Sequence, residues 1–186
     1  MSVQLLRRQF TVEEYHRMAK AGILTEDDRV ELIEGEIVQM SPVGRRHASH
    51  VKRLNTLFTQ LLGVRVVVSV QDPVELSDRS EPQPDIALLQ PRSDFYEAGH
   101  PQPKDIFLLV EVADTTVESD RQVKIPLYAG SGIFEVWLID INEQSIETYR
   151  QPTAAGYQNI QDCRRGQSIS PQAFPEISLT VDQVLG

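Results

Sequence analysis

The sequence predicts an α/β or α+β domain in which helices flank a mixed central β-sheet. Helical and strand-like patterns follow one another along the 186 residues. Two strand-like segments, 64–70 and 106–112, are almost continuously apolar, which is typical of strands covered on both faces. A chain of this length buries a sizeable core. We expect one domain over 1–186, with a core at about 10–150 and a C-terminal extension at 151–186.

The N-terminal third predicts a helix, a hairpin and a second helix. Thr11 and Glu14 form a capping-box pattern that opens a helix at about 11–21. Two short apolar runs separated by Glu-Gly predict a β-hairpin over 29–40. Apolar residues then recur at helical spacing over 46–62, so this helix presents one face to a core.

The rest of the chain alternates between strands and irregular segments, with one further helix between them. The expected elements are strands at 64–70, 85–89, 106–112, 133–139 and 145–150, a loop at 90–104 and a helix at 120–129. Residues 74–76 continue the first of these strands or form its return. Pro126 is unfavourable inside a helix, so the regular helix is short or begins near Lys124. The tail reads as irregular, with a short helix near 181–185.

Cysteine content and apolar runs bear on the compartment. Cys163 is the single cysteine, which excludes an intramolecular disulfide framework and fits a reducing environment. Residues 1–10 lack the continuous apolar core of a signal peptide. No run approaches the roughly 18 apolar residues that span a bilayer. We therefore expect a cytoplasmic protein with no membrane partner.

Glu111 and Asp85 are the first candidate site residues. Glu111 lies in an otherwise apolar strand, where a buried carboxylate must be paired, protonated or metal-bound. The alternative is a position at the strand end, in water. Asp85 opens the strand that would pair with it, although an aspartate after proline also serves as a turn or cap residue. If the two strands form a hairpin, both carboxylates meet at one end and make an oxygen site for a hard cation.

Lys124 is the third candidate. With Asp120 and Tyr128 it falls at i, i+4 and i+8 of the expected helix, so the three residues share one face. The alternative is a plain surface pair between Asp120 and Lys124, worth a few tenths of a kcal/mol.

Together these motifs resemble the Uma-two family of bacterial restriction endonucleases, within the PD-(D/E)XK nuclease superfamily. The resemblance covers roughly 10–150. It is carried by Pro84-Asp85, Glu111-Val112, Asp120, Lys124, Tyr128 and the run from Glu135 to Asp140, with Glu31-Leu-Ile-Glu34-Gly35-Glu36 and a histidine, His47 or His50, before them. One departure concerns the lysine expected two positions after the glutamate. Ala113 stands there, and Lys124 would replace it, as in this family.

The resemblance implies a restriction-endonuclease-like fold that hydrolyses DNA with Mg²⁺, or Mn²⁺, and forms a homodimer. It assigns catalysis to Asp85, Glu111 and Lys124, and metal binding to Asp85, Glu111 and the Val112 carbonyl. Additional site residues would be Glu31, His50, Asp120 and Tyr128. Gln71 is a weaker candidate, better explained as a polar residue at a strand end.

The charge distribution gives conflicting indications about a DNA partner. A net charge of -9 argues against nucleic-acid binding, which depends on Lys and Arg. Basic residues nevertheless cluster at the start of the second helix. This cluster either contacts phosphates or is a solvated helix start, and its members are Arg45, Arg46, Lys52 and Arg53.

Two other functions stay open, and three classes of site find little support. The chain could be a nucleic-acid-binding or regulatory module without cleavage, or a structural homo-oligomer with a vestigial acidic cluster. The second requires Glu111 to pair with an arginine. Ser49, Ser69 and Cys163 lack the context of a nucleophile. The four histidines show no zinc-ligand motif, and Gly130 and Gly132 end a helix, so they form no phosphate loop.

Overall fold

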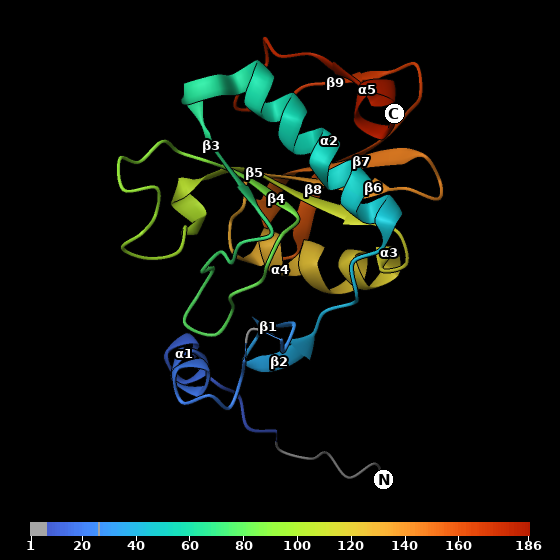
Figure 1. Cartoon of the computed structure of the whole chain (residues 1–186). Helices are drawn as coiled ribbons and strands as arrows, with labels where there is room; N and C mark the ends of the chain where they lie inside the picture. The colour runs from blue at the N-terminus through green and yellow to red at the C-terminus, as the bar shows by residue number, and fades with distance from the viewer. Residues whose placement is uncertain (1–6, 26) are drawn as a thin grey trace, which may run out of the picture.

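The computed structural model describes residues 7–25 and 27–186. Residues 1–6, part of the segment judged not to be a signal peptide, and residue 26 lie outside the described residues. A central β-sheet lies between helix α2 (Arg45–Leu62) on one side and helices α3 (Val117–Ser119) and α4 (Ile125–Gly130) on the other (Figure 1). None of the helices within the described ranges combines the length and the apolar character needed to cross a bilayer.

The sheet has six strands in the order β3-β4-β5-β6-β7-β8. Their bounds are β3 Val67–Val70, β4 Ile86–Leu89, β5 Ile106–Ala113, β6 Glu135–Asp140, β7 Ser145–Thr153 and β8 Gly156–Arg164. β5 and β6 pair in parallel through a helical crossover, and every other neighbouring pair is antiparallel. The predicted mixed sheet flanked by helices is therefore confirmed.

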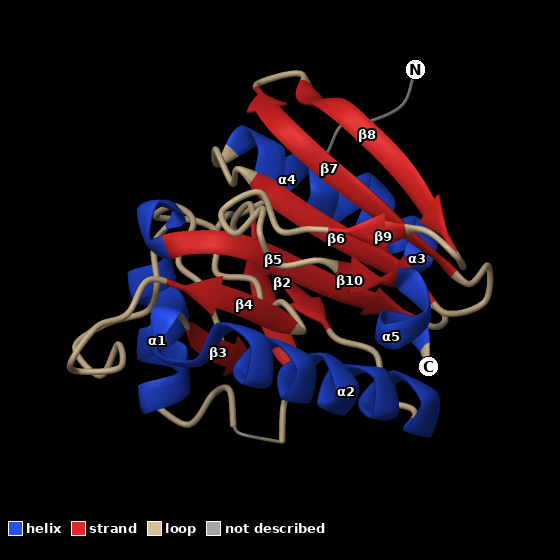
Figure 2. Ribbon diagram, turned by 90° about the horizontal axis from the view of Figure 1, so that it is seen from above, coloured by secondary structure: helices blue, strands red, loops and turns tan. Residues whose placement is uncertain are grey.

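Apolar side chains cover both faces of the sheet, which explains why β4, β5 and β6 do not alternate with polar residues. On one face, α2 (Arg45–Leu62) and α5 (Val181–Leu185) pack over the strands, with Phe58 against Trp137 at a ring-centroid distance of 6.0 Å. Figure 2 shows α5 beside α2 over this face. On the other face, Tyr128 belongs to the second cluster, to which α4 (Ile125–Gly130) contributes.

The predicted N-terminal helix and hairpin are confirmed. Thr11 caps α1 (Val12–Lys20) in a capping box with Glu14, because each residue's side chain accepts the other's backbone N–H. β1 (Val30–Ile33) and β2 (Glu36–Gln39) form the hairpin. Its turn needs glycine at Gly35, where φ is 81° and an added Cβ would lie 2.6 Å from the Gln9 Cβ.

The crossover helix is longer than expected and contains a wide turn. It runs through α3 (Val117–Ser119), a π turn at Asp120–Lys124 and α4, and the Ile125 N–H bonds to the Asp120 carbonyl five residues back. The prediction from Pro126 is confirmed, because the regular α-helix α4 is short and begins at Ile125, directly after Lys124. The π turn accommodates the proline, which has no N–H to donate and would crowd the carbonyl four residues earlier in a regular α-helix.

Two local predictions were wrong. The first strand begins only at Val67, since Gly63–Arg65 forms a 3-10 turn, and residues 74–76 join no strand. The predicted loop at 90–104 is confirmed, and it ends in a 3-10 turn at Pro103–Asp105.

The segment after Arg150 is not irregular. It completes β7, forms β8 and adds a two-stranded sheet of β9 (Ser168–Ile169) and β10 (Leu179–Thr180) before the expected α5. β8 is an edge strand with mostly exposed side chains, so its sequence carries a weak apolar signal and its pairing with β7 defines it.

Candidate active site

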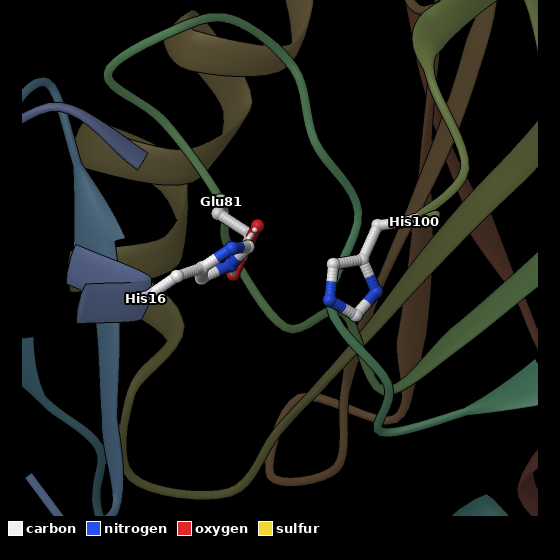
Figure 3. Close-up of side chains that lie close together, drawn as sticks. All are labelled: His16, Glu81 and His100. Atoms are coloured by element: carbon white, nitrogen blue, oxygen red, sulfur yellow. Dashed lines mark hydrogen bonds and ion pairs between the residues drawn. The ribbon is translucent and has the colours of Figure 1, made fainter. Parts of the chain in front are cut away.

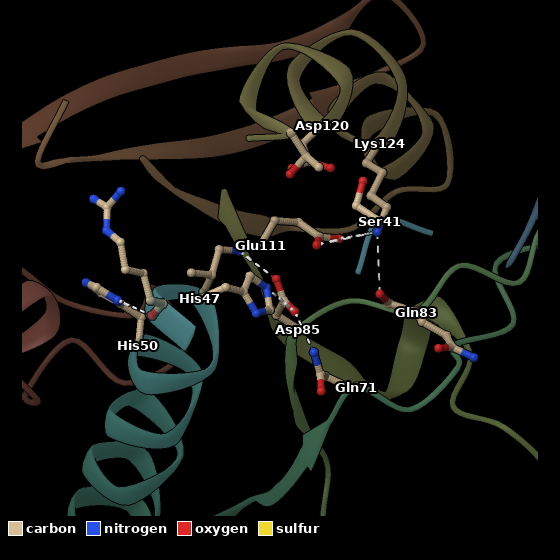
Figure 4. Close-up of polar contacts among 12 residues, drawn as sticks. Ser41, His47, His50, Gln71, Gln83, Asp85, Glu111, Asp120 and Lys124 are labelled. Atoms are coloured by element: carbon tan, nitrogen blue, oxygen red, sulfur yellow. Dashed lines mark hydrogen bonds and ion pairs between the residues drawn. The ribbon is translucent and has the colours of Figure 1, made fainter. Parts of the chain in front are cut away.

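Asp85 and Glu111 lie side by side on one face of the sheet. Ile86 of β4 pairs with Val110 of β5 in antiparallel register. Asp85, one residue before Ile86, therefore lies opposite Glu111, one residue after Val110, and their side chains project from the same face. Both residues line a cavity of about 560 Å³. The convergence that the sequence hypothesis required is present (Figure 4).

The Asp85 carboxylate is held by three donors. The Val112 backbone N–H donates to Oδ2 at 2.8 Å, which ties Asp85 to β5. Gln71 Nε2 donates to Oδ1 at 3.1 Å, and His47 Nε2 lies 2.9 Å from the same oxygen. The hydrogen bond to Asp85 raises the pKa of His47 above its usual value. Gln71, which sequence reasoning treated as a strand-end residue, therefore contacts the site.

Glu111 is only 2% exposed and contacts two side chains of the crossover helix. The Tyr128 hydroxyl donates to Oε1 at 2.5 Å, and Lys124 Nζ lies 3.3 Å from the same oxygen. Burial raises the pKa of Glu111 well above its usual value, and the charges of Asp120 and Asp85 add to this effect against the opposing charge of Lys124.

Lys124 is a buried ammonium surrounded by oxygen atoms. Its Nζ lies 3.3 Å from Glu31 Oε2 and donates to the Gln83 carbonyl at 3.4 Å, in addition to its contact with Glu111. Burial by itself would lower the pKa of Lys124, but the surrounding carboxylates outweigh it and hold the pKa above its usual value. Lys124 therefore carries its charge at neutral pH.

The π turn explains how two residues of the helix reach the site. Asp120 and Lys124 are its first and last residues, and both are buried. Asp120 Oδ2 accepts from the Thr116 hydroxyl at 2.7 Å, and burial raises its pKa. The alternative of a surface ion pair between Asp120 and Lys124 does not describe this helix, since the ion partners of Lys124 are Glu31 and Glu111.

Glu31 arrives from the N-terminal hairpin. β1 forms a bridge between Leu32 and Glu81, so the hairpin lies beside the segment that leads into β4. The Gln83 N–H donates to Glu31 Oε2 at 3.0 Å, and Lys124 contacts the same oxygen. The hairpin thus supplies an acidic group to a cavity formed mainly by the sheet and the crossover helix.

The donor set fits a hard divalent cation. Four of the carboxylates that line the cavity are buried (Glu31, Asp85, Glu111 and Asp120), and Lys124 is the ammonium buried among them. Mg²⁺ binds through one or two carboxylates and completes its shell with other oxygens or water. Asp85 and Glu111 are placed to supply such ligands. The Val112 N–H is used by Asp85, and the predicted role of its carbonyl as a ligand stays a prediction.

The other predicted site residues are scattered. The structure puts His47, rather than His50, against Asp85, and the His50 Nδ1 contacts the Arg46 carbonyl of its own helix. In the basic cluster, Arg46 pairs with Asp114, and Arg53 donates to the Leu185 carbonyl. The side chains of Arg45 and Lys52 are exposed.

Sequence reasoning missed one constellation. His16, Glu81 and His100 come from three distant segments and have ligand atoms within 4.8 Å of one another. The sequence shows no zinc-ligand motif among the histidines, so it gave no indication of this group. Since their spacing of 65 and 19 residues matches no linear motif, only the tertiary fold reveals the group.

Comparison with known proteins bears on the family and the fold. The model of the Uma2 (Uma-two) family, described as "Putative restriction endonuclease", matches residues 12–182. No match was found among curated proteins. The fold is similar to the crystal structure of a "putative nuclease belonging to DUF820 from Anabaena variabilis", with a TM-score of 0.74 and 17% identity over 95% of this chain and 97% of that chain. At this identity, the likeness concerns the fold alone.

Proposed function

Since the chain belongs to the Uma2 family, as its motifs predicted, we propose that it is a Mg²⁺-dependent endonuclease that hydrolyses phosphodiester bonds of DNA. One observation carries the proposal. Asp85 and Glu111 lie opposite each other on neighbouring strands and line one cavity, with a buried lysine ammonium 3.3 Å from Glu111. A buried, net-negative group of this kind is typical of a site that binds a cation.

The residues of the cavity have different roles in the proposed reaction. Asp85 and Glu111 would hold Mg²⁺, or Mn²⁺, with the Val112 carbonyl as a further ligand. When bound, the metal lowers the pKa of a water molecule and neutralises charge on the phosphate. Lys124 orients the attacking water or donates to the phosphate oxygens as negative charge develops there. Its contacts with Glu31 and the Gln83 carbonyl hold the ammonium in place.

Three neighbouring groups position these residues. Gln71 and His47 hold Oδ1 of Asp85, which fixes the orientation of that carboxylate. Tyr128 does the same for Glu111 from the crossover helix. Such hydrogen bonds to ligating carboxylates typically account for 10–100-fold in metal affinity or activity.

The substrate and the assembly belong to the same proposal. The exposed Arg45 and Lys52 at the start of α2 are the members of the basic cluster that remain available for phosphates. They lie on the helix that also carries His47. A homodimer would provide two such cavities, one for each strand of a duplex.

The test is cleavage of plasmid DNA with and without Mg²⁺. Asp85→Asn and Glu111→Gln should each reduce Mg²⁺-dependent cleavage to background while circular dichroism remains that of the wild type. Glu118→Gln is the matched control, because Glu118 is an exposed carboxylate of the same crossover helix and lies outside the cavity lining. It should cleave normally. Wild-type rates in either site variant would refute the assignment.

A nucleic-acid-binding or regulatory module without cleavage is the second candidate, because one fold can host different activities. Such a protein would retard DNA in a gel without cutting it, and Mg²⁺ would not raise its melting temperature. A nuclease of the proposed kind should gain thermal stability from Mg²⁺, and Asp85→Asn should abolish that gain.

The structural homo-oligomer is not supported. It requires Glu111 to pair with an arginine, whereas Glu111 contacts Lys124 and Tyr128 beside Asp85.

A further inference from the structure

Two histidines and a buried glutamate meet on the side of the molecule where the N-terminal helix packs. His16 lies on α1, Glu81 on the segment that leads into β4, and His100 on the loop between β4 and β5. Figure 3 shows the His16 ring against the Glu81 carboxylate, with His100 facing them from the other side. The two imidazoles lie 5.9 Å apart between centroids in an edge-to-face arrangement.

The Glu81 carboxylate is deeply buried but has few hydrogen-bond donors around it. It is only 3% exposed, and both of its oxygens lie 2.9 Å from the same atom, His16 Nε2. That nitrogen carries at most one hydrogen, while an ionised carboxylate accepts about four hydrogen bonds. Within the described residues, no other side chain donates to these oxygens. A buried carboxylate with one shared donor calls for a cation.

The ligand types select the class of metal. Two imidazoles and one carboxylate suit Zn²⁺ and its transition-metal neighbours, whereas Mg²⁺ prefers oxygen ligands alone. Three protein ligands of the His-His-Glu type with a fourth position for water are a known zinc arrangement. The cluster therefore differs in its chemistry from the carboxylate cavity around Asp85.

The distances allow an ion to enter after small side-chain rotations. Two ligand atoms about 2.1 Å from one zinc ion at a tetrahedral angle lie about 3.4 Å apart. The His16–Glu81 contact of 2.9 Å is slightly shorter than this value, and all three ligand atoms lie within 4.8 Å of one another. His16 is exposed and His100 is partly exposed, so both rings have room to adjust and the site is open to solvent.

We propose that His16, Glu81 and His100 form a binding site for Zn²⁺ or a similar transition-metal ion that ties the N-terminal helix to the loop between β4 and β5. The ion takes the place of the contact between His16 Nε2 and the Glu81 carboxylate, so that both groups become its ligands. It joins three segments that are otherwise linked by backbone hydrogen bonds such as Val12 N–H to the Asp78 carbonyl and Glu75 N–H to the Pro101 carbonyl.

This position connects the site to the cavity without being part of it. Glu81 forms the bridge to Leu32 of β1, and the neighbouring Glu31 contacts Lys124. An ion held at Glu81 therefore stabilises the packing of the hairpin that carries Glu31. The expected result of binding is greater thermal stability of the whole chain, independent of any cleavage activity.

The test is titration of the metal-free full-length protein with Zn²⁺ in the presence of excess Mg²⁺, by calorimetry and by thermal unfolding. The wild type should bind one Zn²⁺ per chain and gain melting temperature. His16→Gln and His100→Gln should each weaken Zn²⁺ binding by at least about 100-fold. Loss of a residue that only hydrogen-bonds a metal ligand already lowers metal affinity by about 10–100-fold, and these variants remove a ligand itself. With Co²⁺ as the probe, visible d–d absorption should appear in the wild type and vanish in both variants.

His47→Gln is the matched control, since it removes the histidine that contacts Asp85 and leaves the cluster intact. It should bind Zn²⁺ as the wild type does. The proposal is overturned if the wild type binds no Zn²⁺, if His16→Gln and His100→Gln bind as tightly as the wild type, or if His47→Gln weakens binding as much as they do. Because DNA cleavage is not measured, a negative result leaves the nuclease proposal standing.

Discussion

The Tyr128 hydroxyl offers a direct measure of how the fold stabilises a buried carboxylate. Tyr128 is fully buried, and its hydroxyl donates to Glu111 Oε1 at 2.5 Å. Tyr128→Phe removes the donor without changing the ring. A hydrogen bond to a charged group contributes about 1.5–3 kcal/mol to stability. For a domain of this size each kcal/mol corresponds to roughly 2–4 °C, so the melting temperature should fall by roughly 3–12 °C.

The chain contains a matched control for this substitution. Tyr157 is also buried, and its hydroxyl donates to a neutral acceptor, the Ile133 carbonyl, at 2.7 Å. Tyr157→Phe should therefore cost only about 0.5–1.5 kcal/mol. Both variants are compared with the wild type by urea unfolding at neutral pH and by calorimetry, where an unchanged urea dependence shows that the unfolded states are comparable.

The interpretation requires that the charge of Lys124 keep Glu111 ionised at neutral pH against the burial that raises the pKa of Glu111. In a Glu111→Gln background the acceptor is neutral, so adding Tyr128→Phe should then cost no more than Tyr157→Phe does. If Tyr128→Phe in the otherwise native chain costs no more than Tyr157→Phe, the charge-assisted bond is absent and the description of the cavity is wrong.

Three further outcomes are expected. Lys124→Met should destabilise the chain by about 3–5 kcal/mol in urea unfolding, because Glu31 and Glu111 lose their buried cation. Adding Glu111→Gln to this variant should restore part of the lost stability. A cost of Lys124→Met below about 1 kcal/mol would contradict the buried ion pairs. Thr11→Ala should loosen α1 by about 1 kcal/mol, measured as faster amide hydrogen exchange in that helix. The backbone N–H of Thr11, followed by Arg8, lowers the pKa of Glu14. The protection of α1 amides, taken relative to their intrinsic exchange rate at each pH, should therefore fall as the pH drops below about 4.5 in the wild type and not in Glu14→Gln.

The strands and helices that pack on the core were predictable from the sequence. Residues 106–112 are apolar without alternation, and this pattern requires a strand covered on both faces. The capping box at Thr11 and the spacing of apolar residues in α2 likewise reflect local rules. β8 was missed because an edge strand with exposed side chains is defined by pairing with β7, and the partner is not visible in its own pattern.

The candidate site was predictable in part. Asp85, Glu111 and Lys124 stood out as charged groups in apolar or helical settings, and the structure brings them together. The sequence could not distinguish His47 from His50, because the two histidines are three positions apart on the same helix. In the structure the His47 ring contacts Asp85, whereas the His50 ring contacts the backbone of its own helix. Gln71 was undervalued, since its contact with Asp85 depends on the left-handed backbone conformation that follows β3.

By itself, the sequence determined the family, the mixed sheet with helices on both faces and the acidic residues of the cavity, since burial patterns and short motifs are local properties of the chain. The tertiary structure alone decided which groups meet. The register of β4 on β5 sets Asp85 opposite Glu111, the π turn brings Lys124 between Glu111 and Glu31, and packing of α1 joins His16 to Glu81 and His100. Such contacts bridge tens of residues, and their positions depend on how all the elements pack together, which no local pattern encodes.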